Sequence, residues 1–202
     1  MVFVDPLFQR VLVDVVRRNG ALFGTSTKPP SSGWVGLPVI FDEVFTGLHR
    51  LSMQTPMSVL GTTPDIAVYA KILTGGLLPM AVTLASSDIF RAFQGSTKAE
   101  ALLHGHSYTA HPVGCAVANR TLELLKHMET DWQATRVKWT HKQVNGIWSF
   151  WDPSFVDSLS RLAGVRHVMA MGTVVTFELD DQVQGKEASL CDERHQLKRV
   201  DL

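Results

Sequence analysis

The chain has 202 residues, 45% of them hydrophobic and 19% charged, and its 19 basic residues balance its 19 acidic ones. This composition is sufficient for a folded core and excludes an intrinsically disordered protein. A net charge of zero gives no electrostatic reason to expect nucleic acid or an anionic membrane as partner. The two cysteines, Cys115 and Cys191, make no disulfide framework, which favours a reducing compartment.

The first predicted element is a helix that begins after Asp5 and ends near Arg18. Asp5 is a suitable N-cap, Pro6 suits a first turn, and the pair Asn19–Gly20 suits the end of a helix. Apolar side chains recur at helical spacing in one stripe, which we expect to face the core. That stripe consists of Leu7, Phe8, Val11, Leu12 and Val15.

Residues 21–36 (ALFGTSTKPPSSGWVG) are rich in glycine, proline and serine, which is typical of a loop. The connection from a helix to the next strand of an α/β unit is normally much shorter. We therefore interpret residues 21–36 as an insertion, or as retained non-coding sequence. A transcript that joins Asn19 almost directly to Leu37 would support the second origin.

Two apolar segments further along end on charged residues. Residues 38–41 are followed by Asp42 and Glu43, and residues 66–70 are followed by Lys71. The first segment predicts a buried parallel strand, whose carboxyl end borders the ligand crevice of an open α/β sheet. A lysine in apolar surroundings is unfavourable unless it is deprotonated, paired or used covalently. Asp42 and Lys71 are therefore the first candidates for chemistry.

The segment from residue 66 to residue 85 has about the length of a membrane span. However, Lys71, the pair Gly75–Gly76 and Pro79 interrupt it near the middle. A strand, a glycine turn and a second strand fit this pattern better. The first ten residues contain an early aspartate and no basic region before an apolar one, so we expect no secretory signal peptide here.

The remaining elements follow from local patterns. We expect strands over residues 78–85, 165–171 and 173–179, helices after Ser86 and from Pro112, helical structure over 131–151, and a frayed polar tail over 181–202. We assign residues 1–130 to one domain and residues 131–180 to the beginning of a second, smaller one.

Three histidines, His104, His106 and His111, lie close together in the sequence and raise the alternative of a zinc site. No clustered cysteine or acidic residue completes a usual ligand set, so we predict no metal. We expect Cys115 to be a small buried residue.

Three motifs, taken together and in order, resemble the class III pyridoxal-phosphate-dependent aminotransferases of fold type I. They are FDEVFTG at residues 41–47, PDI and AKILTGG within residues 64–76, and HGHSYTAHPVGCAVA at residues 104–118. The resemblance implies an α/β fold: the large domain of fold type I, with a mixed, mostly parallel sheet and flanking helices. It also implies the beginning of a C-terminal α+β subdomain, with the N-terminal half of the family fold absent.

The resemblance implies roles for four residues. Lys71 would be the catalytic amine that binds pyridoxal 5'-phosphate, and Asp42 would hold the proton on the ring nitrogen of the cofactor. Ser107 would contact the cofactor phosphate of the partner subunit. Glu43 would support the site structurally, without touching the cofactor. Taken alone, each residue has a simpler interpretation, as a surface lysine, a turn cap or a salt-bridge partner.

The third motif is similar to the eukaryotic diaminopelargonate aminotransferases of biotin synthesis, which are commonly fused behind a dethiobiotin synthetase domain. This implies a homodimeric transaminase that moves an amino group between small molecules, from S-adenosylmethionine to 8-amino-7-oxononanoate. It also implies a soluble intracellular protein, mitochondrial or cytoplasmic, with neither nucleic acid nor a membrane as partner.

Parts of the family pattern are altered or missing. His49 and Ser52 stand where the family has glycine, which leaves the conformation of their loop open. The turn that cradles the phosphate and the aromatic that stacks on the ring belong to the absent half. Arg161 and Arg166 do not match the family's substrate-binding arginine. Two alternatives therefore stay open: a class III relative of different chemistry, such as a decarboxylase or another ω-aminotransferase, and a non-catalytic fragment.

Overall fold

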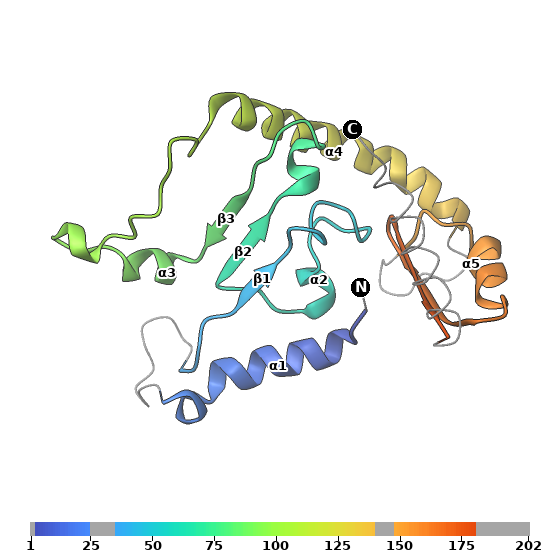
Figure 1. Cartoon of the computed structure of the whole chain (residues 1–202), viewed down its shortest axis with the longest axis horizontal. Helices are drawn as coiled ribbons and strands as arrows, with labels where there is room; N and C mark the ends of the chain where they lie inside the picture. Colours follow the sequence, from blue (N-terminus) through green and yellow to red (C-terminus); the bar gives the residue numbers. More distant parts are fainter. Residues whose placement is uncertain (1–2, 25–34, 140–147, 181–202) are drawn as a thin grey trace, which may run out of the picture.

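The computed structural model describes residues 3–24, 35–139 and 148–180. In this part of the chain a three-stranded sheet lies between helix α1 and helix α4, and a separate two-stranded hairpin lies near the end of α4 (Figure 1). In chain order the elements are α1 Pro6–Arg18, η1 Gly20–Phe23, β1 Ile40–Asp42, α2 Met57–Leu60, β2 Ile66–Tyr69, η2 Lys71–Thr74, β3 Val82–Ala85, α3 Ser87–Ala92, η3 Lys98–Glu100, α4 Pro112–Trp139, α5 Pro153–Ser160, β4 Val165–Met171 and β5 Val174–Leu179.

The sheet confirms the predicted strands, in shorter form, and their mixed directions, but β1 is mostly exposed rather than buried. Strands β1 and β2 are parallel, with Asp42 opposite Val68, whereas β2 and β3 are antiparallel, with Ile66 opposite Ala85. The segment tested as a membrane span therefore consists of a strand, a turn and a strand. None of the helices in the described ranges combines the length and apolarity that crossing a membrane requires.

Helix α1 begins and ends as predicted, but it faces the other way. The side chain of Asp5 accepts a hydrogen bond from Leu7 N at 2.7 Å, and Asn19 is the C-cap. The expectation that the apolar stripe faces the core is wrong: Leu7, Phe8 and the other stripe residues are exposed, and the buried residue of α1 is Val13. The opposite face turns inward, and it includes a charged side chain that contributes to the packing.

That charged side chain is Arg17, which forms an ion pair with the buried Asp65 at 3.0 Å. The same Asp65 Oδ2 accepts a hydrogen bond from Val39 N at 2.7 Å, and Arg17 donates to Thr63 O at 2.5 Å. Because Asp65 precedes β2 and Val39 precedes β1, one carboxylate joins the end of α1 to the starts of two strands. This contact fixes which face of the helix meets the sheet.

The two ends of the predicted insertion meet at the end of α1. The backbone N–H groups of Val35 and Gly36 both donate to Arg17 O, at 3.0 and 2.7 Å, and Leu37 N donates to Val16 O at 3.1 Å. Residues 25–34 lie outside the described part of the chain. The segment therefore leaves and re-enters the fold at one point, as an insertion would.

Deletion of residues 21–36 is expected to leave the fold intact. Since Leu37 already lies against the last turn of α1, the shortened connection needs no rearrangement of β1, and the closure entropy of a loop changes only slowly with its length. We expect the free energy of unfolding to change by less than about 1 kcal/mol in urea titrations. A loss of more than twice that amount would show that these residues contribute to packing.

The core of the described chain lies between η2 and α4. Leu48, Leu73 and Ala118 form its buried cluster, with the half-buried Tyr69 and Leu125 packed against it. Small residues near the start of α4 allow this close approach, as the sequence suggests. Helix α4 continues without a break past residue 130, where we place the boundary between domains, and that division stays a prediction.

The prediction of helical structure over residues 131–151 is only partly correct. Residues up to Trp139 continue α4, and residues 140–147 lie outside the described ranges. Ser149 instead pairs with Gly172 in an isolated β-bridge, so residues 148–151 are not helical. A tryptophan-rich sequence is compatible with helix or with extended structure. Here pairing with the turn of the β4–β5 hairpin gives Ser149 an extended conformation.

The hairpin of β4 and β5 is attached to the loop that follows β1. Thr173 N donates to Arg50 O at 2.9 Å, and the Trp148 indole donates to Ser52 O at 3.2 Å. A Cβ atom on Gly172 would lie 2.2 Å from Arg50 O, so only glycine fits at this joint. The polypeptide directly after Asp42 and Glu43 therefore carries the C-terminal hairpin.

Candidate functional site

Asp42 and Lys71 lie at the same edge of the sheet. Asp42 is the last residue of β1, and β2, which runs parallel to β1, ends at Tyr69, two residues before Lys71. Glu43 N donates to Val68 O at 3.0 Å, so the two strand ends stay paired as they reach this edge. The structure thus confirms the predicted neighbourhood of the two strand ends that carry this carboxylate and this amine.

The backbone at Lys71 is unusual. Its φ is 51°, a left-handed conformation that a lysine adopts only where the surrounding structure enforces it. Thr74, the most deeply buried side chain here, donates to Leu78 O at 2.5 Å, and Gly75 and Gly76 follow with positive φ values. The turn that presents Lys71 is therefore stabilised by the buried hydrogen bond of Thr74.

Lys71 itself is exposed in this chain, which corrects the expectation that it is a buried amine at a strand end. It is the first residue of η2, beyond the strand, and α4 packs against this short helix. The apolar neighbours of Lys71 predict a buried segment. Those neighbours turn toward α4 instead, and the lysine faces solvent.

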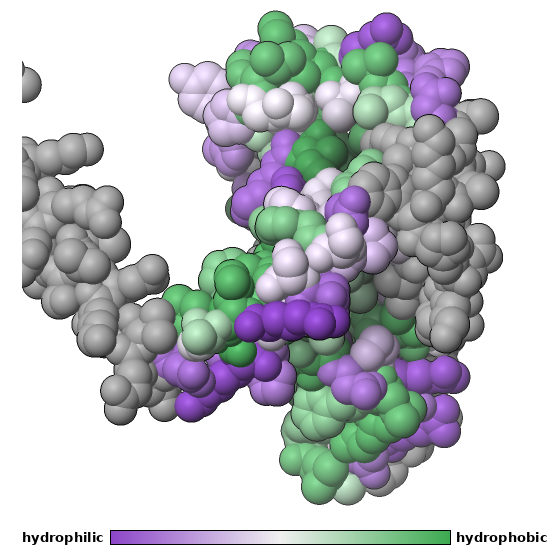
Figure 2. Space-filling model, turned by 90° about the vertical axis from the view of Figure 1, so that its right-hand side faces the viewer, coloured by the Kyte–Doolittle hydropathy of each residue, from purple (hydrophilic) through white to green (hydrophobic). Residues whose placement is uncertain are grey.

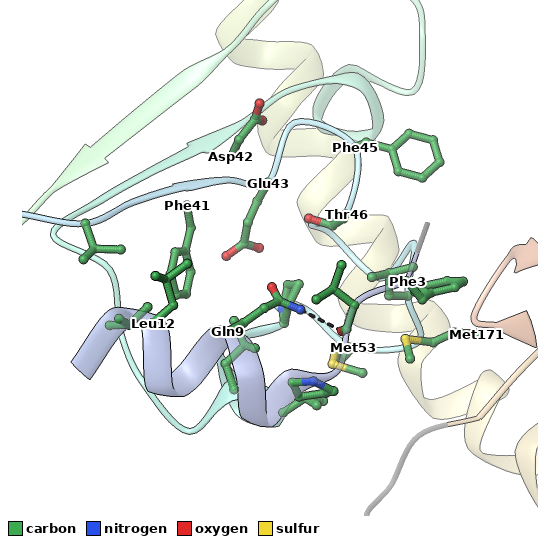
Figure 3. Close-up of a pocket in the computed structure, with 18 of the residues that line it drawn as sticks. Phe3, Gln9, Leu12, Phe41, Asp42, Glu43, Phe45, Thr46, Met53 and Met171 are labelled. Atoms are coloured by element: carbon green, nitrogen blue, oxygen red, sulfur yellow. Dashed lines mark hydrogen bonds between the residues drawn. The ribbon is translucent and has the colours of Figure 1, made fainter. Parts of the chain in front are cut away.

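Asp42 and Glu43 point to opposite sides of β1, as successive residues of a strand do (Figure 3). The carboxylate of Asp42 points away from Gln9 and Leu12 of α1, is exposed, and accepts a hydrogen bond from Val44 N at 3.1 Å. Glu43 points toward α1. Asp42 and Lys71 thus follow from the ends of two paired strands, whereas Glu43 faces the other way, and their shared role in one reaction centre stays a prediction.

Glu43 is a buried carboxyl group with only 3% of its surface exposed. Its Oε1 accepts a hydrogen bond from the Thr55 hydroxyl at 2.6 Å, whereas Oε2 forms no hydrogen bond of normal geometry with any described residue, although the Tyr69 hydroxyl is near enough to influence the carboxyl group. Burial raises the pKa of Glu43 above 4.5, and the hydroxyls of Thr55 and then Tyr69 offset only part of that effect. Within the described ranges Glu43 takes part in no salt bridge, which was the simpler interpretation of this residue.

Stability is expected to fall with rising pH because of Glu43. Its pKa is higher in the folded chain than in the unfolded one, so the folded chain binds more protons, and the stabilisation is complete below pH 4.5 and lost through the raised pKa. Glu43→Gln removes this dependence, so its free energy of unfolding relative to the parent chain should increase over that pH window.

The measurement is urea unfolding of both proteins at a series of pH values. Glu123→Gln, at an exposed carboxylate on α4, serves as the control and should follow the parent chain at every pH. A constant difference between Glu43→Gln and the parent would mean that Glu43 titrates alike in the folded and unfolded chains.

A cavity of about 510 Å³ lies between α1 and the carboxyl end of β1. Its walls are mostly apolar, and Figure 3 shows Glu43 pointing into it. The residues that line it include Leu12, Phe41, Glu43, Met53 and Met171. Asp42 is also a lining residue, whereas Lys71 and Ser107 are not, so this cavity does not unite the predicted cofactor-binding residues.

Ser107 lies on a segment, residues 91–113, in which every residue is exposed. The histidines of the zinc alternative are on the same segment, but each is engaged locally: Nδ1 of His106 accepts from Tyr108 N at 3.1 Å, and Nδ1 of His111 accepts from Gly114 N at 3.1 Å. Within the described ranges no group of three histidine, cysteine or acidic residues could hold a metal ion.

The loop after Glu43 keeps a left-handed backbone where the sequence has lost glycine. His49 has φ 69° and Ser52 has φ 71°, and Leu48 at 56° joins them. Sequence reasoning raised the question at His49 and Ser52 but gave no signal for Leu48. The hydrogen bonds from the hairpin to this loop explain how these residues hold a conformation that ordinarily favours glycine.

Residues 35–197 match the Aminotransferase class-III family. The bifunctional dethiobiotin synthetase/adenosylmethionine-8-amino-7-oxononanoate aminotransferase of Emericella nidulans is 49% identical over 191 residues, covering 90% of this chain and 24% of that protein. The corresponding bifunctional mitochondrial protein of Arabidopsis thaliana is 42% identical, covering 89% of this chain and 19% of the relative. The chain thus spans a quarter or less of these curated relatives.

Solved structures give the same fold. The adenosylmethionine-8-amino-7-oxononanoate aminotransferase of Methanocaldococcus jannaschii matches with a TM-score of 0.56 and 29% identity, over 72% of this chain and 32% of that one. A Bacillus anthracis aminotransferase matches with a TM-score of 0.58 and 23% identity, over 73% of this chain and 31% of that one. The described elements are therefore part of a larger fold.

Proposed function

Because the chain belongs to the class III aminotransferase family, we propose that it carries the reactive amine and the ring-binding carboxylate of a pyridoxal-phosphate-dependent transaminase. The observation that carries this proposal is the edge of the sheet where two parallel strands end beside Asp42 and Lys71. In open α/β sheets this edge is where ligands bind.

The residues present fit the cofactor. A carboxylate is the group that pairs with a protonated ring nitrogen, and a primary amine is the group that reacts with an aldehyde. Both side chains are exposed, and neither forms an ion pair with another residue in the described part of the chain. The left-handed backbone at Lys71 is the kind of local strain that accumulates at functional sites.

Pyridoxal phosphate, when bound, supplies an aldehyde for the amino group and an electron sink for the charge left on the substrate carbon. Lys71 Nζ would hold the cofactor until substrate arrives and then move a proton from the substrate α-carbon as general base and acid. The carboxylate of Asp42 would keep the proton on the ring nitrogen. Ser107, on its exposed segment, would bind the phosphate in the partner subunit of a homodimer.

The proposed reaction is amino transfer from S-adenosylmethionine to 8-amino-7-oxononanoate, giving 7,8-diaminononanoate in biotin biosynthesis. The names of the Emericella nidulans and Methanocaldococcus jannaschii relatives support this choice. The names of the plant relatives support a mitochondrial location. A second candidate, β-alanine–pyruvate type transamination, is supported by a Pseudomonas aeruginosa relative that is 39% identical over 90 residues.

Two measurements test the proposal. The purified chain mixed with pyridoxal phosphate should gain a visible absorbance that remains after gel filtration; no such band would favour a non-catalytic fragment. The chain combined with the rest of the fold should then transfer nitrogen from S-adenosylmethionine to 8-amino-7-oxononanoate. Transfer only from other amino donors would place it with a class III relative of different specificity.

A further inference from the structure

Helix α1 is apolar over more of its circumference than its own sheet covers. Val13 packs inward, while Leu7, Phe8 and Val11 on the outer side are 66%, 61% and 50% exposed. Figure 2, which looks at the molecule from the right-hand side of Figure 1, shows hydrophobic side chains open to solvent at several places, its lower end among them. The apolar face of an amphipathic helix normally packs against other protein, and here that face is uncovered.

The cavity beside α1 contains an incomplete polar contact. Leu12, on the outer stripe of α1, lines this cavity, so the cavity adjoins the exposed face. Glu43 points into the same cavity with Oε2 lacking a hydrogen-bond partner among the described residues, although the residue is almost fully buried. Buried polar atoms are nearly always paired, so whatever covers this surface should bring a donor.

The size of the related folds identifies the occupant. The described elements span 31% of the Bacillus anthracis aminotransferase and 32% of the Methanocaldococcus jannaschii one. Each of those folds therefore contains further layers that this chain does not supply. A small molecule could fill the cavity, but it would leave the outer face of α1 uncovered.

We propose that the outer face of α1 and the adjoining cavity form one docking surface for the polypeptide that completes the aminotransferase fold, and that this polypeptide places a hydrogen-bond donor against Glu43 Oε2. Apolar contacts along α1 supply most of the buried area. The single donor, an arginine, a lysine or a backbone N–H, sets the register of docking, because a misplaced segment leaves the carboxylate unpaired. Asp42 also lines this cavity, but its carboxylate points away from α1, and Lys71 is not among the lining residues.

The test uses the full chain and the part of the aminotransferase region of the Emericella nidulans relative that this chain does not match, produced separately. Calorimetric titration without cofactor should show a one-to-one complex. Phe8→Asp on α1 and Glu43→Leu in the cavity should each raise the dissociation constant by at least about tenfold. Leu162→Asp, at a similarly exposed position after α5, should bind like the parent chain.

Circular dichroism of each variant checks folding first. If Glu43→Leu does not fold, Glu43→Gln keeps the shape of the side chain and should bind about fivefold more weakly. The proposal is overturned by the absence of a complex, by equal losses in Phe8→Asp and Leu162→Asp, or by unchanged binding of the Glu43 variants. It is also overturned if the chain alone forms a dimer that Phe8→Asp dissociates, since the occupant is then a second copy. Because no cofactor is added, these outcomes are independent of the transaminase proposal.

Discussion

Replacement of Lys71 with alanine is expected to abolish covalent capture of pyridoxal phosphate. Treating the mixture with borohydride should fix the cofactor on the Lys71 peptide of the parent chain, as read by mass spectrometry, and leave no labelled peptide in Lys71→Ala. In the completed enzyme, amino transfer should fall by about 10²- to 10⁴-fold, the usual contribution of a positioned acid–base group. The physical reason is that Lys71 is the amine that follows β2, the strand paired in parallel with β1, which ends at Asp42.

The control is Lys126→Ala, at an exposed lysine on α4. It should keep both the labelled peptide and the activity. Cofactor fixed equally on Lys126 and Lys71 would indicate unselective reaction of surface amines, and the site assignment would then be wrong. Because Lys71 is exposed, the alanine variant should unfold at the same urea concentration as the parent chain.

Replacement of Asp65 with alanine is expected to destabilise the fold by about 3 kcal/mol, a large part of the stability of an ordinary domain. The substitution removes the acceptor of both Val39 N and the guanidinium of Arg17, and it leaves these donors partly buried. Urea unfolding followed by tryptophan fluorescence measures the change. No charge-bearing contact elsewhere in the described chain joins a helix to the starts of two strands.

Asp14→Ala provides the matched comparison for Asp65. Asp14 lies on α1, the helix that carries Arg17, and it is half exposed. Its carboxylate is 3.6 Å from the exposed Arg18. Exposed pairs contribute little, so its removal should change stability by less than about 0.5 kcal/mol. Equal effects of the two substitutions would mean that solvent screens the Asp65 ion pair as well.

Local signals were sufficient to predict most elements of this fold. Capping residues such as Asp5 and Ser86 marked helix starts, and their side chains do accept the expected N–H bonds. Alternation predicted the hairpin, which pairs Val165 with Leu179 as an antiparallel ribbon. The candidate site was predictable as far as its two strand ends, because parallel strands bring their carboxyl ends to one edge whatever lies around them.

The orientation of α1 and the exposure of Lys71 were not predictable from the sequence. An amphipathic pattern tells which residues prefer burial but not which layer buries them, and α1 presents its apolar stripe away from its own sheet because Arg17 must reach Asp65. Similarly, the apolar neighbours of Lys71 pack on α4 while the lysine does not. Ser107 lies on an exposed segment, and its contact with the cofactor phosphate of a partner subunit stays a prediction.

Because residues 21–36 leave and rejoin the fold at a single point, a reporter domain can be inserted there. A reporter domain whose own termini lie close together, such as a small fluorescent protein, fits between Gly24 and Val35 without separating α1 from β1. A fluorophore at this position would sit near Arg17 rather than at the sheet edge with Lys71. Labelling there would allow assembly to be followed in solution while the reaction centre is left untouched.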